Sequence, residues 1–263
     1  MASRFILPYS FTYDSGTQNA LAPVSNLNSD IFSLVWQSAA TVVSGTIIVN
    51  LGSANAAAGY DTVALIGTNF RAGDAWRVRC ASTNALTGGY DSGTISTFSG
   101  TLPAGSTSKC ILKLPSTQTY QFVGIDFTTT GNPAGFAQAQ RLVVGRSLSL
   151  ANGAGVDLGH QITFMDQSVA YTGPNWSTFD AYNVLAQMKL SVSLIGDSDW
   201  RTDWYGFLQS VGKNKAFLVI PDDTQPANWQ AEAVFGRIIQ DAATPLTSYG
   251  IRRTDLVIQS LAP

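Results

Sequence analysis

The chain has 263 residues and a mass of 27.9 kDa, which suits one large domain or two modest ones. Only 12% of the residues are charged, about half the usual share, and the net charge is −2. This composition excludes a protein that binds nucleic acid through a basic face, and no apolar run approaches the ~18 residues of a membrane helix. Ser and Thr number 51, against five Lys and one Glu. Because good helix formers are this scarce, we expect a mainly β protein.

The first half of the chain predicts short strands separated by turns. Strands are expected over residues 45–52, 62–66, 76–80, 110–114, 120–127 and 140–150. Residues 62–66 form a continuous apolar run, as expected for a strand covered on both faces. Residues 81–108 are polar and predict a loop or a pair of weak edge strands. Strands at this spacing, with no helical pattern between them, indicate an antiparallel sandwich.

A change of composition at residues 151–155 predicts a domain boundary, with a sandwich over 1–150 and a β-rich α+β domain over 156–263. Strands are expected over 161–172, 182–195, 216–220, 231–240 and 255–261. One helix is predicted over 198–211, because Trp200, Trp204, Phe207, Leu208 and Val211 follow a helical period. Asp197 or Ser198 can cap this helix, and Gly212 stands where it should stop.

Cysteine and histidine are rare, which narrows the chemistry. Cys80 and Cys110 share the parity of core-facing residues, so two buried reduced thiols are favoured over a disulfide. His160 is the only histidine, and two cysteines without histidine partners make no zinc site. No G-x-S-x-G elbow surrounds any serine. The sequence therefore predicts no catalytic residue, no metal and no cofactor.

Two groups of acidic residues are candidate sites. Asp197, Asp199 and Asp203 suit a hard cation, but they also suit the first turn of the predicted helix, where acids complement the macrodipole. Asp222-Asp223 could supply half of a paired-carboxylate site, or simply form a turn after Pro221. The structural interpretation is favoured for both groups. An Asp-based glycan hydrolase remains the enzymatic alternative to a protein without catalytic activity.

Three aromatic residues are the candidate contacts. Tyr171, Trp176 and Trp229 lie in predicted turns beside Gly or Pro, whereas Trp36 and Trp76 have the parity of core residues. An exposed loop tryptophan can stack on a sugar ring or anchor an interface, because it offers a large rigid apolar area and one donor. Ordinary anchoring of the loop is the third interpretation of these three residues.

Several motifs of the first half occur in a familiar order. The motif Val-Ser-Asn-Leu at 24–27 is followed by Val-Trp-Gln-Ser at 35–38. The predicted strand 47–52 ends in Leu-Gly, and the run 61–70 ends in Gly-Thr-Asn-Phe. Trp-Arg-Val-Arg follows at 76–79. This order, over about residues 20–150, resembles the galactose-binding-like jelly roll of many carbohydrate-binding modules and bacteriophage tail proteins. Residues 120–127 and 141–145 look like its closing pair of strands. The calcium site and the exposed loop aromatics of sugar-binding members find no residue-by-residue match.

The second half resembles the domain that often follows such a sandwich in phage virion proteins. A Trp-bearing helix precedes a strand ending in Pro (217–221), a Trp loop (228–229) and a strand carrying Gly (234–237). The resemblance implies a virion structural protein of the tail or baseplate, assembled in the host cytoplasm. Its expected partners are other tail or baseplate proteins and copies of itself in a symmetric ring, with a host-surface glycan as a further partner and no nucleic acid or membrane insertion. The alternative is a carbohydrate- or host-receptor-binding module, on the virion or free, with a cleft at one end of the sandwich lined by loop residues such as 81–108.

Overall fold

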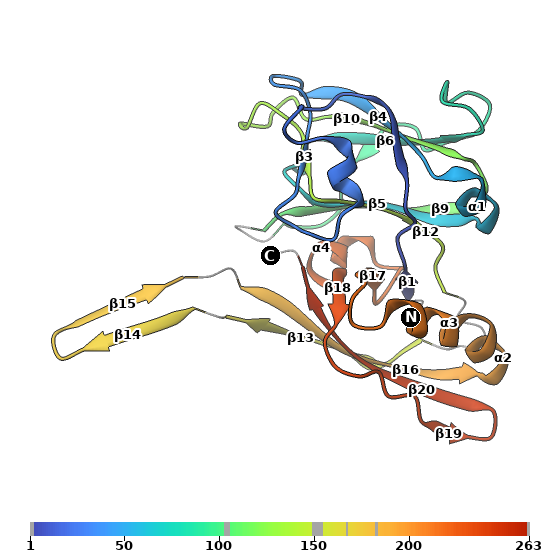
Figure 1. Cartoon of the computed structure of the whole chain (residues 1–263), viewed down its shortest axis with the longest axis vertical. Coiled ribbons are helices and arrows are strands. Elements are labelled where there is room, and N and C mark those ends of the chain that lie inside the picture. Colours follow the sequence, from blue (N-terminus) through green and yellow to red (C-terminus); the bar gives the residue numbers. More distant parts are fainter. Residues whose placement is uncertain (1–2, 103–105, 149–154, 167, 182–183, 262–263) are drawn as a thin grey trace.

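A computed structural model describes residues 3–102, 106–148, 155–166, 168–181 and 184–261. The protein is mainly β, as the composition predicts. A sandwich lies on one side of the molecule, a second β domain with a helix lies on the other, and a two-stranded arm projects from the second domain (Figure 1). No helix within these described ranges has the length and hydropathy of a membrane span.

The sandwich is built from two main sheets. The larger sheet has the order β2-β4-β10-β6-β7 with β8 beside β6, the smaller has the order β12-β5-β9, and β11 pairs with β3. The strands are β2 (Thr12–Gly16), β3 (Trp36–Gln37), β4 (Ser44–Asn50), β5 (Tyr60–Thr68), β6 (Ala75–Ala81), β7 (Tyr90–Asp91), β8 (Ile95–Ser96), β9 (Ser108–Gln118), β10 (Phe122–Thr128), β11 (Gln138–Ala139) and β12 (Arg141–Gly145). Of the two alternatives for residues 81–108, the weak edge strands are confirmed, as β7 and β8. A 3-10 turn (η1, Val24–Asn28) and a short helix (α1, Gly52–Ala58), which the sequence did not predict, complete the sandwich.

The second domain is one curled sheet in the order β1-β17-β18-β20-β16-β13, with β19 beside β20. Its strands are β1 (Arg4–Ile6), β13 (Gly155–Met165), β16 (Leu185–Gly196), β17 (Phe217–Ile220), β18 (Val234–Ile238), β19 (Leu246–Ser248) and β20 (Ile251–Ser260). Arg4–Ile6 pairs with β17, so the predicted assignment of the first residues to the sandwich is wrong. The predicted boundary at 151–155 lies, except for Gly155, outside the described residues.

The predicted helix is present over residues 197–211, as α2 (Asp197–Asp199), a π-helical turn (Trp200–Trp204) and α3 (Tyr205–Val211). It packs Trp204, Phe207 and Val211 on the sheet. The predicted cap by Asp197 or Ser198 is wrong, because the N-cap is Gly196 and no side chain caps the helix. The strand predicted over 231–240 is also shorter, because η4 (Pro226–Asn228) and α4 (Trp229–Glu232) precede β18.

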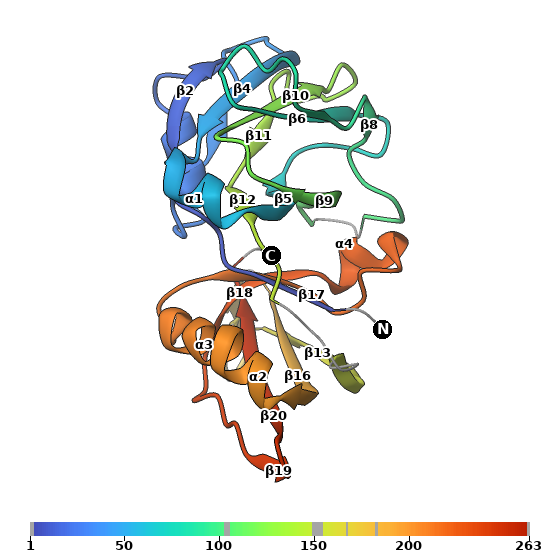
Figure 2. The ribbon, with the colours of Figure 1, turned by 90° about the vertical axis from the view of Figure 1, so that its right-hand side faces the viewer.

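The two domains share a hydrophobic core. β5 sends Val63 and Leu65 into the sandwich, whereas Ala64 and Ile66 pack on the second domain, whose contacts include Leu218. Figure 2 shows β17 and β18 between the sandwich and α3. The continuous apolar run at 62–66 therefore belongs to a strand covered on both faces, as predicted.

Candidate functional site

The arm is a hairpin of β14 (Val169–Gly173) and β15 (Trp176–Asp180). The arm continues from the paired strands β13 and β16, whose last pair of residues before the arm is Met165 and Leu185. The predicted continuous strand 161–172 is interrupted between Met165 and Val169, where the arm leaves the sheet, whereas the strand predicted over 182–195 is present as β16 from Leu185 onward. The arm stands clear of both domains (Figure 1), and its two strands pair only with each other.

One face of the arm carries three large apolar side chains. Tyr171 pairs with Thr178, and Gly173 pairs with Trp176, so Val169, Tyr171 and Trp176 lie on the same face, together with Thr178 and Asp180. The indole of Trp176 lies over Gly173, where a Cβ would come within 2.3 Å of the indole nitrogen. Tyr171 is 46% exposed and Trp176 is 59% exposed. An isolated two-stranded hairpin is marginally stable in water, so a partner that covers this exposed face would stabilise the arm.

Trp229 is not an exposed contact residue. It is 9% exposed, packs in the core shared by the two domains, and donates its indole N–H to the carbonyl oxygen of Asp222 at 2.9 Å. The predicted glycan or partner contact of Trp229 is therefore wrong, because α4 turns the ring toward the sandwich. Its neighbour Gln230 also contacts the sandwich, accepting the Lys109 backbone N–H at 2.9 Å.

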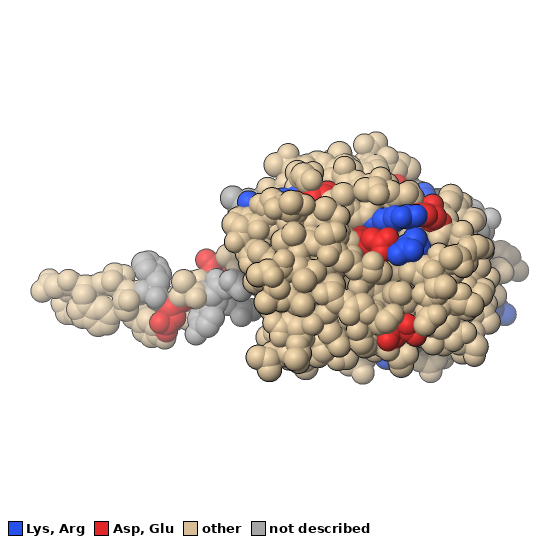
Figure 3. Space-filling view, turned by 90° about the horizontal axis from the view of Figure 1, so that it is seen from above, with Lys and Arg blue, Asp and Glu red and all other residues tan. Residues whose placement is uncertain are grey.

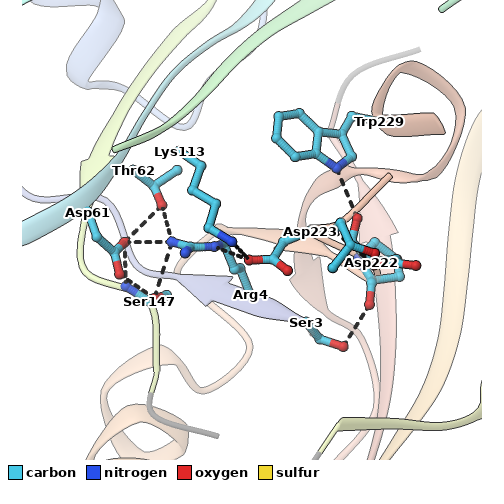
Figure 4. Close-up of polar contacts among 11 residues, drawn as sticks. Ser3, Arg4, Asp61, Thr62, Lys113, Ser147, Asp222, Asp223 and Trp229 are labelled. Carbon is cyan, nitrogen blue, oxygen red and sulfur yellow. Dashed lines mark hydrogen bonds and ion pairs between the residues drawn. The ribbon is translucent and has the colours of Figure 1, made fainter. Parts of the chain in front are cut away.

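An ionic cluster joins the two domains (Figure 4). The Arg4 guanidinium contacts Asp61 of the sandwich at 3.1 Å and Asp223 at 2.8 Å. Lys113 of β9 reaches the same carboxylate of Asp223 at 2.5 Å. Burial alone would raise the pKa of Asp223, but hydrogen bonds and charge from Lys113 and Arg4 hold this pKa below its ordinary value. Asp223 thus connects the domains as a carboxylate.

Asp222 does not form a paired-carboxylate site with Asp223. Its side chain accepts the backbone N–H of Thr224 at 2.9 Å, which is the ordinary role of Asp in a turn. Thr224 also donates its hydroxyl to this carboxylate at 2.6 Å. The structure thus places Asp222 in a surface turn and Asp223 in the domain interface, and the turn interpretation of the sequence is confirmed.

At the acidic start of the helix, Asp197 is engaged in an ion pair within the protein. Asp197 pairs with Arg201 at 2.7 Å, one turn along the helix. Within the described residues, no group of three or more His, Cys, Asp or Glu side chains is placed to hold a metal ion. A shallow depression on the second sheet includes His160, Ser191 and Asp255. The Ser191 hydroxyl donates to Asp255, so His160 does not orient it as a nucleophile.

The outer face of the sandwich carries charges that neutralise one another. Arg77 pairs with Asp91, and Arg79 contacts Asp126 at 2.7 Å. Figure 3 shows a patch of positively and negatively charged residues on a face that is otherwise mainly uncharged, and the projecting arm with few charges.

Among the described residues, the exposed aromatic side chains all belong to the second domain: Phe164, Tyr171, Trp176, Tyr205 and Tyr249.

The two cysteines are free and buried in the sandwich core, as predicted. Burial raises the pKa of the Cys80 thiol to about 11. Burial also raises the pKa of the Cys110 thiol, beside Thr68. Since only the thiolate is a good nucleophile, both groups are inert at neutral pH.

A cleft lies at one end of the sandwich, as the binding-module alternative expects, and its lining takes Leu102, Ser106 and Thr107 from residues 81–108 and the rest from other loops and strand ends. Its volume is about 350 Å³, and its lining includes Asn69, Arg71, Leu102, Thr107 and Gln138. The side-chain amide of Asn69 already donates to the Phe136 carbonyl oxygen at 2.9 Å. The cleft is thus lined by polar groups that also hold its loops in place.

Comparisons with known proteins give limited similarity. No protein-family model and no curated protein matches the sequence. Among solved structures, chitosan-binding module 1 from a chitosanase/glucanase of Paenibacillus sp. IK-5 is similar at 17% identity and a TM-score of 0.35, over 54% of this chain and 98% of the module. CBM32-1 from a family 31 glycoside hydrolase of Clostridium perfringens is similar at 9% identity and a TM-score of 0.33, over 53% of this chain and 96% of the module. Each module thus aligns with about half of this chain.

Proposed function

We propose that this protein is a structural subunit of a larger assembly, a component of the tail or baseplate of a tailed bacteriophage, and that the arm formed by β14 and β15 joins it to a neighbouring subunit. The observation that carries the proposal is the apolar face of the arm. Trp176 is 59% exposed on a hairpin whose described side chains belong to none of the hydrophobic core clusters. Large exposed apolar faces on soluble proteins mark interaction sites.

The composition supports the same function. With 12% charged residues, the chain has few of the solvating groups that keep a monomer apart from its neighbours. The shared core and the ionic cluster of Arg4, Asp61 and Asp223 join the two domains, so the arm projects from two domains held in a fixed arrangement. A virion subunit present in repeated copies needs such a fixed arrangement, because each contact between copies must have the same geometry.

The test removes the arm and leaves the sheet intact. Met165 and Leu185 are paired in register, so Asn-Gly in place of residues 166–184 closes β13 and β16 with a two-residue hairpin turn. We expect the arm-less protein to keep its thermal unfolding transition and to lose assembly, measured by light scattering over a concentration series. Quantitative mass spectrometry of purified tailed particles should find the intact chain at a fixed copy number. An arm-less protein that still enters particles at the same copy number would contradict the proposal.

A carbohydrate-binding module is the second candidate function. The observation that favours it is the cleft at the end of the sandwich, with the Arg71 side chain exposed at its edge. Against it, the exposed aromatic rings that would stack on sugars lie on the second domain among the described residues. A glycan array should decide, with Arg71→Ala as the cleft variant and Trp176→Ala as the arm variant. Binding that Arg71→Ala abolishes and Trp176→Ala leaves unchanged would establish this function.

A further inference from the structure

A groove on the second domain is a further uncovered apolar surface. Helix α3 and the segment that follows β18 form it, with a volume of about 390 Å³ and a lining that includes Trp200, Tyr205, Leu208, Lys213, Ile238 and Ala242. Tyr205 is 55% exposed. The volume is in the range of pockets that enclose small molecules or large side chains.

The arm and the groove of one molecule cannot meet. Strand β16 leaves the arm at Leu185 and reaches the helix at Gly196, and its twelve residues span about 40 Å at roughly 3.3 Å each. Figure 1 accordingly shows the arm and α2 at opposite ends of this strand. Any contact between the arm and the groove must therefore join two molecules.

The two surfaces are complementary in charge as well as in polarity. Residues 164–184 of the arm region contain Asp166 and Asp180 and no Lys, Arg or His. Helix α3 is followed by Lys213, which lines the groove, and by Lys215 two residues further along the chain. Asp241 also lines the groove and pairs with Lys213, but this carboxylate is 95% exposed, and an ion pair of this kind exchanges partners at little cost.

We propose that the arm of one copy of this chain seats its apolar face, with Trp176 and Tyr171, in the α3 groove of a second copy. This inference rests on the proposed assembly function and names its contact. Because the two surfaces differ, two copies either exchange arms reciprocally in a two-fold dimer or repeat the contact head-to-tail in a ring or a filament. The arm's acidic residues face the lysines at the C-terminal end of α3, and the aromatic face of the arm covers Tyr205 and Leu208.

Cysteine cross-linking of the full chain tests this contact. Asn175→Cys places a thiol at the tip of the arm, and Gln209→Cys places one at the groove, both at exposed positions. The native Cys80 and Cys110 are buried and do not interfere. We expect a mixture of the two variants to form a disulfide-linked dimer under mild oxidation, and each variant alone to form none. Ala57→Cys on the exposed surface of α1 is the matched control and should link to neither.

The outcomes separate the contact from the function. Trp176→Ala added to the Asn175→Cys copy should abolish the linked dimer, and unfolding curves verify that each variant folds. Oligomers by light scattering without the arm–groove link would overturn this contact and leave the assembly function standing. A link between two Asn175→Cys copies would replace the contact with a two-fold pairing of arms. A monomer at every concentration, with no link, would overturn the contact and self-assembly together.

Discussion

Trp176 and Trp229 have the same sequence signature and opposite environments, so replacing each with Ala should separate stability from association. Trp229 is 9% exposed and donates a hydrogen bond at 2.9 Å. Removal of a buried tryptophan costs about 3–5 kcal/mol of folding free energy. For a chain of this size, each kcal/mol lowers Tm by about 2–4 °C, so we expect Trp229→Ala to lower Tm by about 10 °C.

Trp176→Ala should act on association instead. The side chain is 59% exposed. Taking a tryptophan area of about 250 Å², this leaves about 150 Å² for a partner to cover. At about 25 cal/mol per Å², complete burial contributes at most about 4 kcal/mol, which corresponds to an affinity loss of up to about 1,000-fold. The unfolding free energy should change by less than about 0.5 kcal/mol, as at other surface positions.

Two measurements check this pair of variants. Chemical unfolding of each variant gives the free energy of folding, and light scattering over a concentration series gives the association constant. Trp229→Ala should be less stable, and Trp176→Ala should be as stable as the native chain and less associated. Equal association of Trp176→Ala and the native chain would refute the reasoning about the arm. An unchanged stability of Trp229→Ala would refute the reasoning about the domain interface.

Three further predictions concern the folded chain. Asp223→Asn should lower stability at pH 7 by about 1–3 kcal/mol. Because the pKa of this carboxyl is lowered on folding, its contribution is present above its unfolded pKa of about 3.9 and is lost as the pH falls through the lower pKa of the folded state, so the stabilities of the two proteins should converge in acid. Cys80 and Cys110 should react with a thiol reagent at pH 8 only after unfolding, and rapid labelling of the native chain would contradict their burial. Gly236→Ala should destabilise by about 1–3 kcal/mol, because its Cβ would lie 2.1 Å from the Gln259 carbonyl oxygen. Gly206→Ala, with no atom within 4 Å of the new Cβ, is the control and should gain about 0.5–1 kcal/mol in helix α3.

The local sequence pattern was sufficient to predict burial wherever the period of apolar residues shows which face of a helix or strand is buried. The alternation around Trp76 and Cys80 places both in the sandwich core, and the helical period from Trp200 to Val211 identifies the helix. The run at 62–66 identifies a strand covered on both faces. In each case the period of apolar residues records which face is buried, and this record is independent of the partner.

Long-range pairing decided the rest. Composition and periodicity by themselves determined a mainly β chain, its core residues, its reduced cysteines and its one long helix. Only the tertiary structure placed β1 in the sheet of the second domain, joined Arg4 to Asp223 across the chain, and separated the exposed Trp176 from the buried Trp229. Both tryptophans directly follow an Asn and stand two or three residues after a Pro, so the local pattern is the same in both cases. Its burial depends on whether another part of the fold lies over it, and that is set by the packing of strands distant in the sequence.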